Sequence, residues 1–512
     1  MLRNMIPRIA CWAVPALGLI DRVFMLAVFG FRYASDDDGV LWMAASDYAH
    51  GIFHGFLFYG QDYNPMFEAL LATPLLALGV RPEIALPLIT SLLALAPFWS
   101  FAAWHYRRGR YVQALLFAAM PLLLPVEYGM ITSMPRGSVQ GIALFALLPW
   151  IDDLRHPAWR AMLTGLVLGT ACVLNPNTLV FSAAWAVRSV MTARIKASFI
   201  GHAAIGLALP AVGHLISTIE VQAHPERIVH TLNDWRMDFH PESIPEGLGQ
   251  LQLHFAWLFP VIPFGQGLFW ALPVMIAVFL LRRDPRLAAA MGAALAVIVL
   301  SFSFAKIYDG APHVVYSYTR MFLAAPLLMV WGITEHLMRS SIRMERVAWP
   351  VLLTALIIAP IKFAHMPGIA EQRLTGQAGL PVQEAAVSLL RKDAAALGDL
   401  VAREHVEAII CLDDHTLLRP QFRAFAYTAW DEHLPPTYLP SYERRYWQRE
   451  RMDTTMYRTL LFTDGDRAMW AWLEQRDPRI TTMSLPGGPA HLLRGNTART
   501  DTLLQRLRSG RF

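Results

Sequence analysis

Charged residues are scarce in this sequence, and cysteines are scarcer still. Asp, Glu, Lys and Arg make up 16% of the 512 residues, whereas an ordinary soluble domain has about a quarter. Three cysteines are too few for a disulfide framework. The sequence also lacks a G-x-x-x-x-G-K-[ST] phosphate loop and an H-E-x-x-H zinc motif. These absences argue against a soluble enzyme, a disulfide-rich secreted domain, an ATPase and a zincin.

Hydrophobic residues reach 55% of the chain and are gathered in long blocks. Residues 161–187, 197–219, 254–281 and 287–305 contain no Asp, Glu, Lys or Arg. A helix that crosses a bilayer needs about 20 apolar residues. We therefore predict a mainly α fold, a polytopic transmembrane helical bundle of about eleven helices, near 9–31, 83–104, 111–126, 139–151, 160–174, 177–190, 197–219, 254–281, 287–305, 317–337 and 347–364.

Basic residues between these blocks predict the orientation of the chain. The net charge is +5, but the arginines fall between apolar blocks rather than on one basic face, so we expect no nucleic-acid partner. With the N-terminus in the cytoplasm, every short cytoplasmic loop is rich in Arg, as the positive-inside rule requires: Arg107, Arg108 and Arg110; Arg155 and Arg160; Arg188, Arg194 and Lys196; Arg282, Arg283 and Arg286; Arg339, Arg343 and Arg346. Keeping Arg188–Lys196 inside requires a turn at Asn175-Pro176-Asn177 rather than one long helix over 160–190.

This orientation predicts an inner (plasma) membrane protein with several regions outside the cytoplasm. They are a first outer loop at 32–82, a second at 220–253, and the C-terminal region from Lys362. We divide the chain into a transmembrane domain over 1–364 and a soluble extracytoplasmic α/β domain over 365–512. In the second domain, helical periodicity covers 381–405, and apolar runs predict strands at 408–412, 458–462, 481–485 and 490–493.

Three adjacent carboxylates, Asp36, Asp37 and Asp38, follow the first predicted helix directly. Mutual repulsion and partial desolvation would raise the pKa of at least one of them, as a general base for a hydroxyl requires. We assign the catalytic role to Asp37, with Asp36 and Asp38 as alternatives. The competing interpretation is a helix N-terminus, capped by Ser35 or Asp36 and stabilised by the acidic side chains that follow.

Further polar and aromatic residues on the outer side are candidates for substrate binding. Aromatic rings stack on sugars but also populate membrane interfaces. Arg binds phosphate through a planar fork, although a cation near a membrane can also contact lipid headgroups. The candidates for contacts to a sugar are Tyr59, Gln61, Asp62, Tyr63 and Glu68, and the candidates for contacts to a phosphate are Arg136, Lys306, His313 and Arg320. Asp21 and Arg22, inside the first helix, are expected to make structural contacts between helices.

The order of these features resembles bacterial GT-C glycosyltransferases of the protein-mannosyltransferase-like and aminoarabinose-transferase-like kind. The resemblance rests on the acidic residues after the first helix and on the segment Tyr59-Gly-Gln-Asp-Tyr-Asn-Pro-Met-Phe-Glu-Ala69. It also includes the helix that ends at Asn175-Pro176, the Tyr318-Thr319-Arg320 start of a late helix, and the C-terminal α/β region. The sequence departs from the pattern in having three Asp in place of a pair, followed by Gly39.

The resemblance implies an inverting glycosyltransferase that moves a sugar from a polyprenyl-phosphate carrier to an acceptor at the outer membrane face. The implied partners are the lipid-linked sugar, membrane lipids and a glycan, glycolipid or protein acceptor. No cofactor is assigned with certainty, although the acidic cluster could hold a divalent cation. The alternative is a transporter or flippase of lipid-linked sugars. Transporters often have paired discontinuous helices, whereas this sequence has one such break, at Asn175-Pro176.

Overall fold

The computed structural model describes residues 2–194, 196–229, 238–262, 264–304, 307, 314, 317–339, 345–375, 384–412, 420–440, 443–463 and 467–509. The chain forms two compact units. The helical unit comprises residues 1–30, 87–219 and 233–379, and the mixed unit comprises 31–86, 220–232 and 380–512. The first outer loop thus belongs to the same unit as the C-terminal region. The domain boundary predicted at residue 365 stays a prediction.

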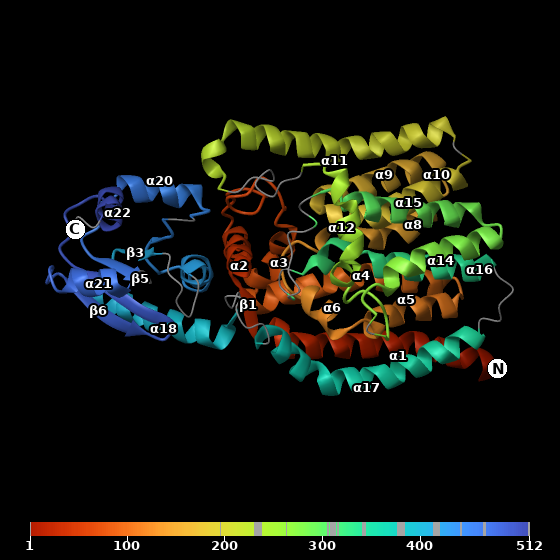
Figure 1. Cartoon of the computed structure of the whole chain (residues 1–512), viewed down its shortest axis with the longest axis horizontal. Helices are drawn as coiled ribbons and strands as arrows, with labels where there is room; N and C mark the ends of the chain where they lie inside the picture. The colour runs from red at the N-terminus through yellow and green to blue at the C-terminus, as the bar shows by residue number, and fades with distance from the viewer. Residues whose placement is uncertain are drawn as a thin grey trace. The chain divides into compact units, whose positions relative to one another are not determined.

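Long apolar helices build the helical unit (Figure 1). Within the described residues, six are long and apolar enough to cross a membrane, and five further apolar helices are shorter. The predicted mainly α membrane fold is therefore confirmed. The principal helices are α1 (Leu2–Met25), α4 (Pro82–Arg107), α5 (Tyr111–Leu123), α9 (Pro157–Leu174), α10 (Leu179–Thr192), α11 (Ala197–Ala223), α14 (Gly267–Leu281), α15 (Pro285–Ser301), α16 (Ala325–Arg339) and α17 (Glu345–Thr375).

Two helix boundaries differ from those that hydropathy predicts by more than ten residues. The span expected at 254–281 contains a helix only from Gly267, because turns around Pro260 interrupt the segment after His254. The last helix does not end at residue 364 but continues to Thr375. Lys362, expected at the start of the outer C-terminal region, therefore lies within α17.

Polar contacts and close helix approaches hold the helical unit together. Helices α1 and α17 lie side by side (Figure 1), and Lys362 Nζ donates to Asp21 Oδ2 at 3.0 Å. Arg22 Nη1 donates to Gly129 O and Thr132 Oγ1, both at 3.0 Å, so the expected structural role of Asp21 and Arg22 is confirmed.

Glycines allow α9 and α11 to pack closely. A Cβ atom at Gly165 would lie 2.0 Å from Ala203 O, and one at Gly206 would lie 1.8 Å from Met162 O. Because any larger side chain would collide with backbone at both positions, these glycines set the distance between the two helices.

A five-stranded sheet forms the centre of the C-terminal part of the mixed unit, in the order β4-β3-β5-β7-β6. Strand β3 (Ala408–Cys411) runs parallel to β4 (Thr437–Tyr438) and β5 (Leu460–Thr463), while β7 (Gly488–Leu493) runs antiparallel to β5 and β6 (Ile480–Leu485). Helices α18 (Val387–Glu404), α20 (Tyr446–Thr454), α21 (Arg467–Glu474) and α22 (Thr500–Ser509) accompany the sheet. Each predicted strand overlaps an observed one, and the short β4 was not predicted.

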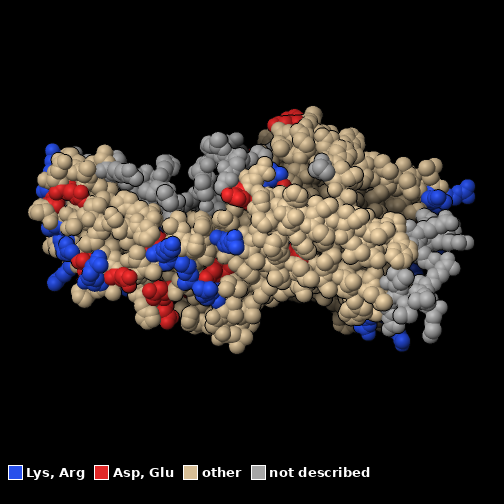
Figure 2. Space-filling model, turned by 90° about the horizontal axis from the view of Figure 1, so that it is seen from below, with Lys and Arg blue, Asp and Glu red and all other residues tan. Residues whose placement is uncertain are grey.

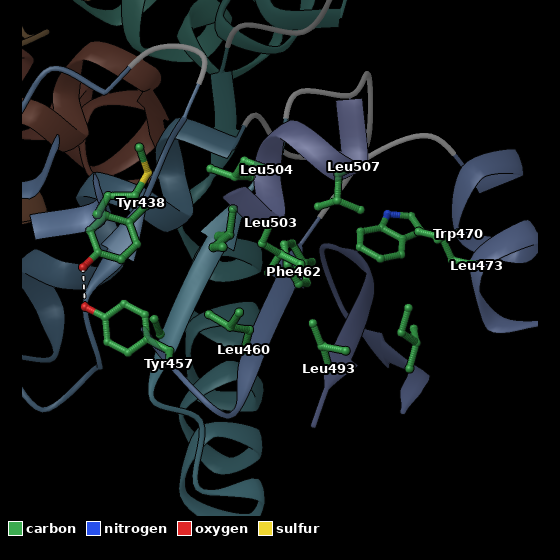
Figure 3. Close-up of a cluster of buried hydrophobic side chains, with 14 residues drawn as sticks. Tyr438, Tyr457, Leu460, Phe462, Trp470, Leu473, Leu493, Leu503, Leu504 and Leu507 are labelled. Carbon is green, nitrogen blue, oxygen red and sulfur yellow. Dashed lines mark hydrogen bonds between the residues drawn. The ribbon is translucent and has the colours of Figure 1, made fainter. Parts of the chain in front are cut away.

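An apolar core lies beside this sheet (Figure 3). Phe462, Trp470 and Leu493 are almost fully buried in it, and Leu503, Leu504 and Leu507 of α22 pack against them. Tyr438 and Tyr457 place their hydroxyl oxygens 2.6 Å apart at its edge. Figure 2 shows that Lys, Arg, Asp and Glu gather on the surface of the C-terminal region, whereas the visible surface of the helical unit is mostly uncharged. This contrast is expected when one unit faces lipid and the other faces water.

The first outer loop completes the mixed unit. Strand β1 (Tyr33–Ser35) pairs antiparallel with β2 (Glu384–Ala386), with Tyr33 opposite Ala386. Helices α2 (Asp36–Ala49) and α3 (Phe67–Ala77) follow. A Cβ atom at Gly39 would lie 3.2 Å from Ala426 N, so the absence of a side chain there lets α2 approach residues 425–426 closely.

Candidate functional site

Asp37 lies in the first turn of α2 and contacts a basic residue from the C-terminal region of the same unit. Arg444 Nη1 donates to Asp37 Oδ1 at 3.2 Å. The Asp37 side chain is 22% exposed and that of Arg444 is 7% exposed. Asp37 therefore combines a fixed orientation with access to solvent or substrate, as a proton acceptor needs.

Asp38 has a different environment from Asp37. Its side chain is buried, and its Oδ2 accepts a hydrogen bond from the backbone N of Ser35 at 2.6 Å. This is the acidic half of a capping box, which satisfies a backbone donor at the start of a helix. The capping interpretation thus accounts for Asp38. The backbone of Asp36 begins α2, while its side chain lies outside the described part of the chain.

Close packing and buried polar contacts position Arg444. Gly60 has a φ of +74°, and a Cβ atom there would lie 2.9 Å from Arg444 Cβ, so this position in the Tyr-Gly-Gln segment favours glycine for two reasons. The Arg444 guanidinium lies 5.4 Å from the ring centre of Phe58. The neighbouring Arg445 is buried and donates to Glu443 Oε1 at 2.7 Å and to Ala424 O at 3.0 Å. These contacts fix the backbone on both sides of Arg444.

Tyr59 is buried, and its hydroxyl donates to Asp47 Oδ2 at 2.8 Å. Burial raises the pKa of Asp47 to about 6, although the hydrogen bond from Tyr59 opposes this shift. The Tyr59 ring lies edge-on to Trp447, at 5.0 Å between ring centres, and Trp447 stacks on His54 at 3.5 Å. Neither Asp47 nor Arg444 was singled out from the sequence, because no spacing or motif marks them.

The other candidates of the Tyr59–Ala69 segment occupy a turn and the start of α3. Gln61 is buried, and its backbone N donates to Phe58 O at 2.8 Å. Asp62 and Tyr63 are half-buried. Glu68 is buried in the first turn of α3, where the helix dipole favours a carboxylate. Their contacts to a sugar remain a prediction.

In the helical unit, Asn177 connects the two segments that carry Arg136 and Arg320. Asn177 Nδ2 donates to Ser138 O at 2.7 Å and to Arg320 O at 3.1 Å. Asn175 Nδ2 donates to Gly137 O at 3.1 Å. The predicted turn at Asn175-Pro176-Asn177 is present as the short helix Pro176–Thr178 between α9 and α10.

This arrangement brings three separated sequence motifs to one place. The Arg136 and Arg320 side chains are both half-buried there. Two arginines on segments that Asn177 connects could bind a phosphate.

Two of the predicted cations cannot be placed. Lys306 and His313 lie outside the described residues. Among the residues that are described, no three His, Cys, Asp or Glu side chains come together as a metal site would require.

Comparison with known proteins identifies the fold. No family model matches the sequence, and no curated protein matches it. Two solved structures of ArnT from Cupriavidus metallidurans, one in the apo state and one bound to undecaprenyl phosphate, each align with a TM-score of 0.56. The alignments cover 94% of this chain and 97% and 98% of the ArnT chains, at 11% and 12% identity. The chain therefore has the fold of ArnT over nearly its whole length, in agreement with the expected helical membrane fold.

Proposed function

We propose that this protein is an inverting glycosyltransferase that moves a sugar from a polyprenyl-phosphate carrier to a hydroxyl group of an envelope acceptor. One observation carries the proposal: Asp37, in the first turn of α2, accepts a hydrogen bond from Arg444 in a chain with the fold of ArnT. The ArnT structure with bound undecaprenyl phosphate supports a polyprenyl phosphate as the carrier. The Arg-rich loops between spans support an active site on the extracytoplasmic side of the inner membrane.

In the proposed reaction, Asp37 accepts the proton of the acceptor hydroxyl. The hydroxyl oxygen forms a bond to the anomeric carbon of the sugar while the bond from that carbon to the phosphate oxygen breaks. The electron pair of the broken bond leaves with the polyprenyl phosphate. Arg136 and Arg320 are the proposed ligands of this phosphate, because fixed cations stabilise charge that develops on a leaving group.

The experiment compares envelope glycans from cells that lack the gene with glycans from cells that carry wild-type or variant genes. Mass analysis should show a sugar addition with the wild-type gene, and Asp37→Asn should abolish it while the protein still inserts into the membrane. Asp399→Asn, on the exposed face of α18, is the matched control and should retain the product. Full product with Asp37→Asn would exclude Asp37 as the base. It would also agree with the alternative of a transporter, which would tolerate that substitution.

The contribution of the arginines is tested in the same cells. Arg136→Gln and Arg320→Gln should each reduce the product, because each removes a charge from the proposed phosphate site. Unchanged product levels in both variants would remove these arginines from the proposal without affecting the role of Asp37.

A further inference from the structure

A cavity of about 550 Å³ lies in the mixed unit beside the β1–β2 pair. Residues from three segments line it: the start of the first outer loop, the start of α4, and the start of α18. Its charged lining residues are Arg32, Arg81, Arg391 and Glu83. With three arginines and one glutamate, the lining has a formal charge of +2. A positive cavity favours an anionic ligand.

One arginine of the cavity is fixed, and the other two are exposed. Arg391 Nη2 donates to Glu83 Oε1 at 2.6 Å, and its guanidinium lies 3.9 Å from the ring centre of Trp430. Trp430 Nε1 also donates to Glu83 Oε2 at 3.0 Å, so both oxygens of this buried carboxylate are engaged. The Arg81 side chain is 62% exposed, and Arg32 is also exposed. Arg81 Nε also lies 3.5 Å from Glu83 Oε1, but the rest of its side chain is exposed, so Arg32 and Arg81 are both accessible to a ligand.

The sequence position of the cavity indicates the depth of its ligand in the membrane. Phe31 is the first residue after the apolar segment Ile9–Gly30, and Pro82 begins the apolar segment Pro82–Arg107. The loop 31–81 joins the C-terminal end of the first segment to the N-terminal end of the second. These two ends therefore lie at the same membrane face. Residues just beyond the ends of spanning helices lie at the level of lipid headgroups, where arginine is a common contact.

We propose that this cavity binds the phosphate group of a lipid, with Arg32 and Arg81 as the ligands that close on it and Arg391 as the fixed cation. Arginine suits this role because its planar fork matches two phosphate oxygens. The apolar side chains of Phe31, Ile84 and Val387 also line the cavity, and they suit the glycerol and upper acyl part of a lipid better than a free anion.

The test measures the binding of a fluorescent phosphatidic acid to the purified full chain in uncharged detergent micelles. Arg32→Gln/Arg81→Gln should weaken binding about tenfold, because two charge-assisted contacts are lost. Arg403→Gln/Arg476→Gln is the matched control: it removes two exposed arginines of α18 and the turn after α21, changes the net charge equally, and should bind within about twofold of wild type. Higher salt should weaken wild-type binding, because ions screen exposed charges.

Three results would overturn the proposal. The first is equal affinity of Arg32→Gln/Arg81→Gln and wild type for phosphatidic acid. The second is full displacement of the lipid by inorganic phosphate, which would assign the cavity to a free anion. The third is equal displacement by phosphatidylcholine, which would show that the exposed phosphate charge is not recognised. If the double variant does not fold, Arg32→Gln and Arg81→Gln alone should each weaken binding about threefold.

Discussion

Carboxylates pair with basic side chains in both units, but the individual pairs are exposed to different degrees. In the helical unit, the Lys362 and Asp21 side chains are 6% and 8% exposed. In the mixed unit, Arg423 and Asp393 are fully buried, whereas Asp37 beside Arg444 is 22% exposed. A sealed pair can only hold structure together, while a pair with an accessible carboxylate can also exchange a proton. Of these three pairs, only the Asp37–Arg444 pair has a carboxylate that is accessible for proton exchange.

Asp37→Asn should give the largest effect and should separate activity from stability. Loss of a general base lowers the rate by about 10² to 10⁴-fold. The melting temperature in detergent should change little, because Asn keeps the shape of Asp37, its oxygen can still accept the hydrogen bond from Arg444, and the Asp37 side chain is partly exposed. Glycan transfer and thermal melting, measured on one preparation, check both expectations. A large loss of melting temperature would instead make the Asp37–Arg444 pair structural.

Lys362→Met should have the opposite profile in the helical unit. It leaves Asp21 buried without its cation, which costs about 3–5 kcal/mol of stability. The double variant Asp21→Asn/Lys362→Met removes both charges and should recover most of the loss. Thermal melting of the three proteins tests this order, and equal stability of the single and double variants would contradict the sealed-pair interpretation.

Asp47→Asn should remove a pH dependence from the mixed unit. The pKa of Asp47 is raised from 3.8 to about 6 in the folded protein, so the folded state disfavours its ionised form. The contribution of Asp47 to the stability of the wild-type protein should fall by up to about 3 kcal/mol as the pH rises from about 4 to about 6. Above that pH it should level off.

The variant isolates this contribution, because Asn can still accept the hydrogen bond from Tyr59. Asp47→Asn should therefore be more stable than wild type at pH 7.5 and similar to it at pH 4. Melting curves at the two pH values provide the check. A stability difference that is the same at both would show that folding does not shift the pKa of Asp47.

Tyr438→Phe should have the smallest effect. It leaves the Tyr457 hydroxyl without its partner at the edge of the core in Figure 3, at a cost of about 1–2 kcal/mol. Tyr438→Phe/Tyr457→Phe should cost less than twice this amount, because no unpaired hydroxyl remains. Additive losses in thermal melting would mean that the two hydroxyls act independently.

Local sequence patterns predicted most of the helices and strands. Apolar blocks predicted the principal helices, and Pro176 predicted the break between α9 and α10. Hydropathy failed at 255–262, since an apolar segment can also form turns when a proline such as Pro260 interrupts it. The roles of the three aspartates were equally ambiguous, because an acidic cluster before a helix is typical of a cap as well as of an active site.

The sequence by itself determined that this chain is a helical membrane protein with a charged α/β region, because apolar length and basic loops are properties of neighbouring residues. Only the tertiary structure separated Asp38, which caps α2, from Asp37, which faces Arg444 from 407 positions away. It alone also joined the segments of Arg136 and Arg320 through Asn177. Such contacts depend on how distant segments pack, and no periodicity or spacing in the sequence records that packing.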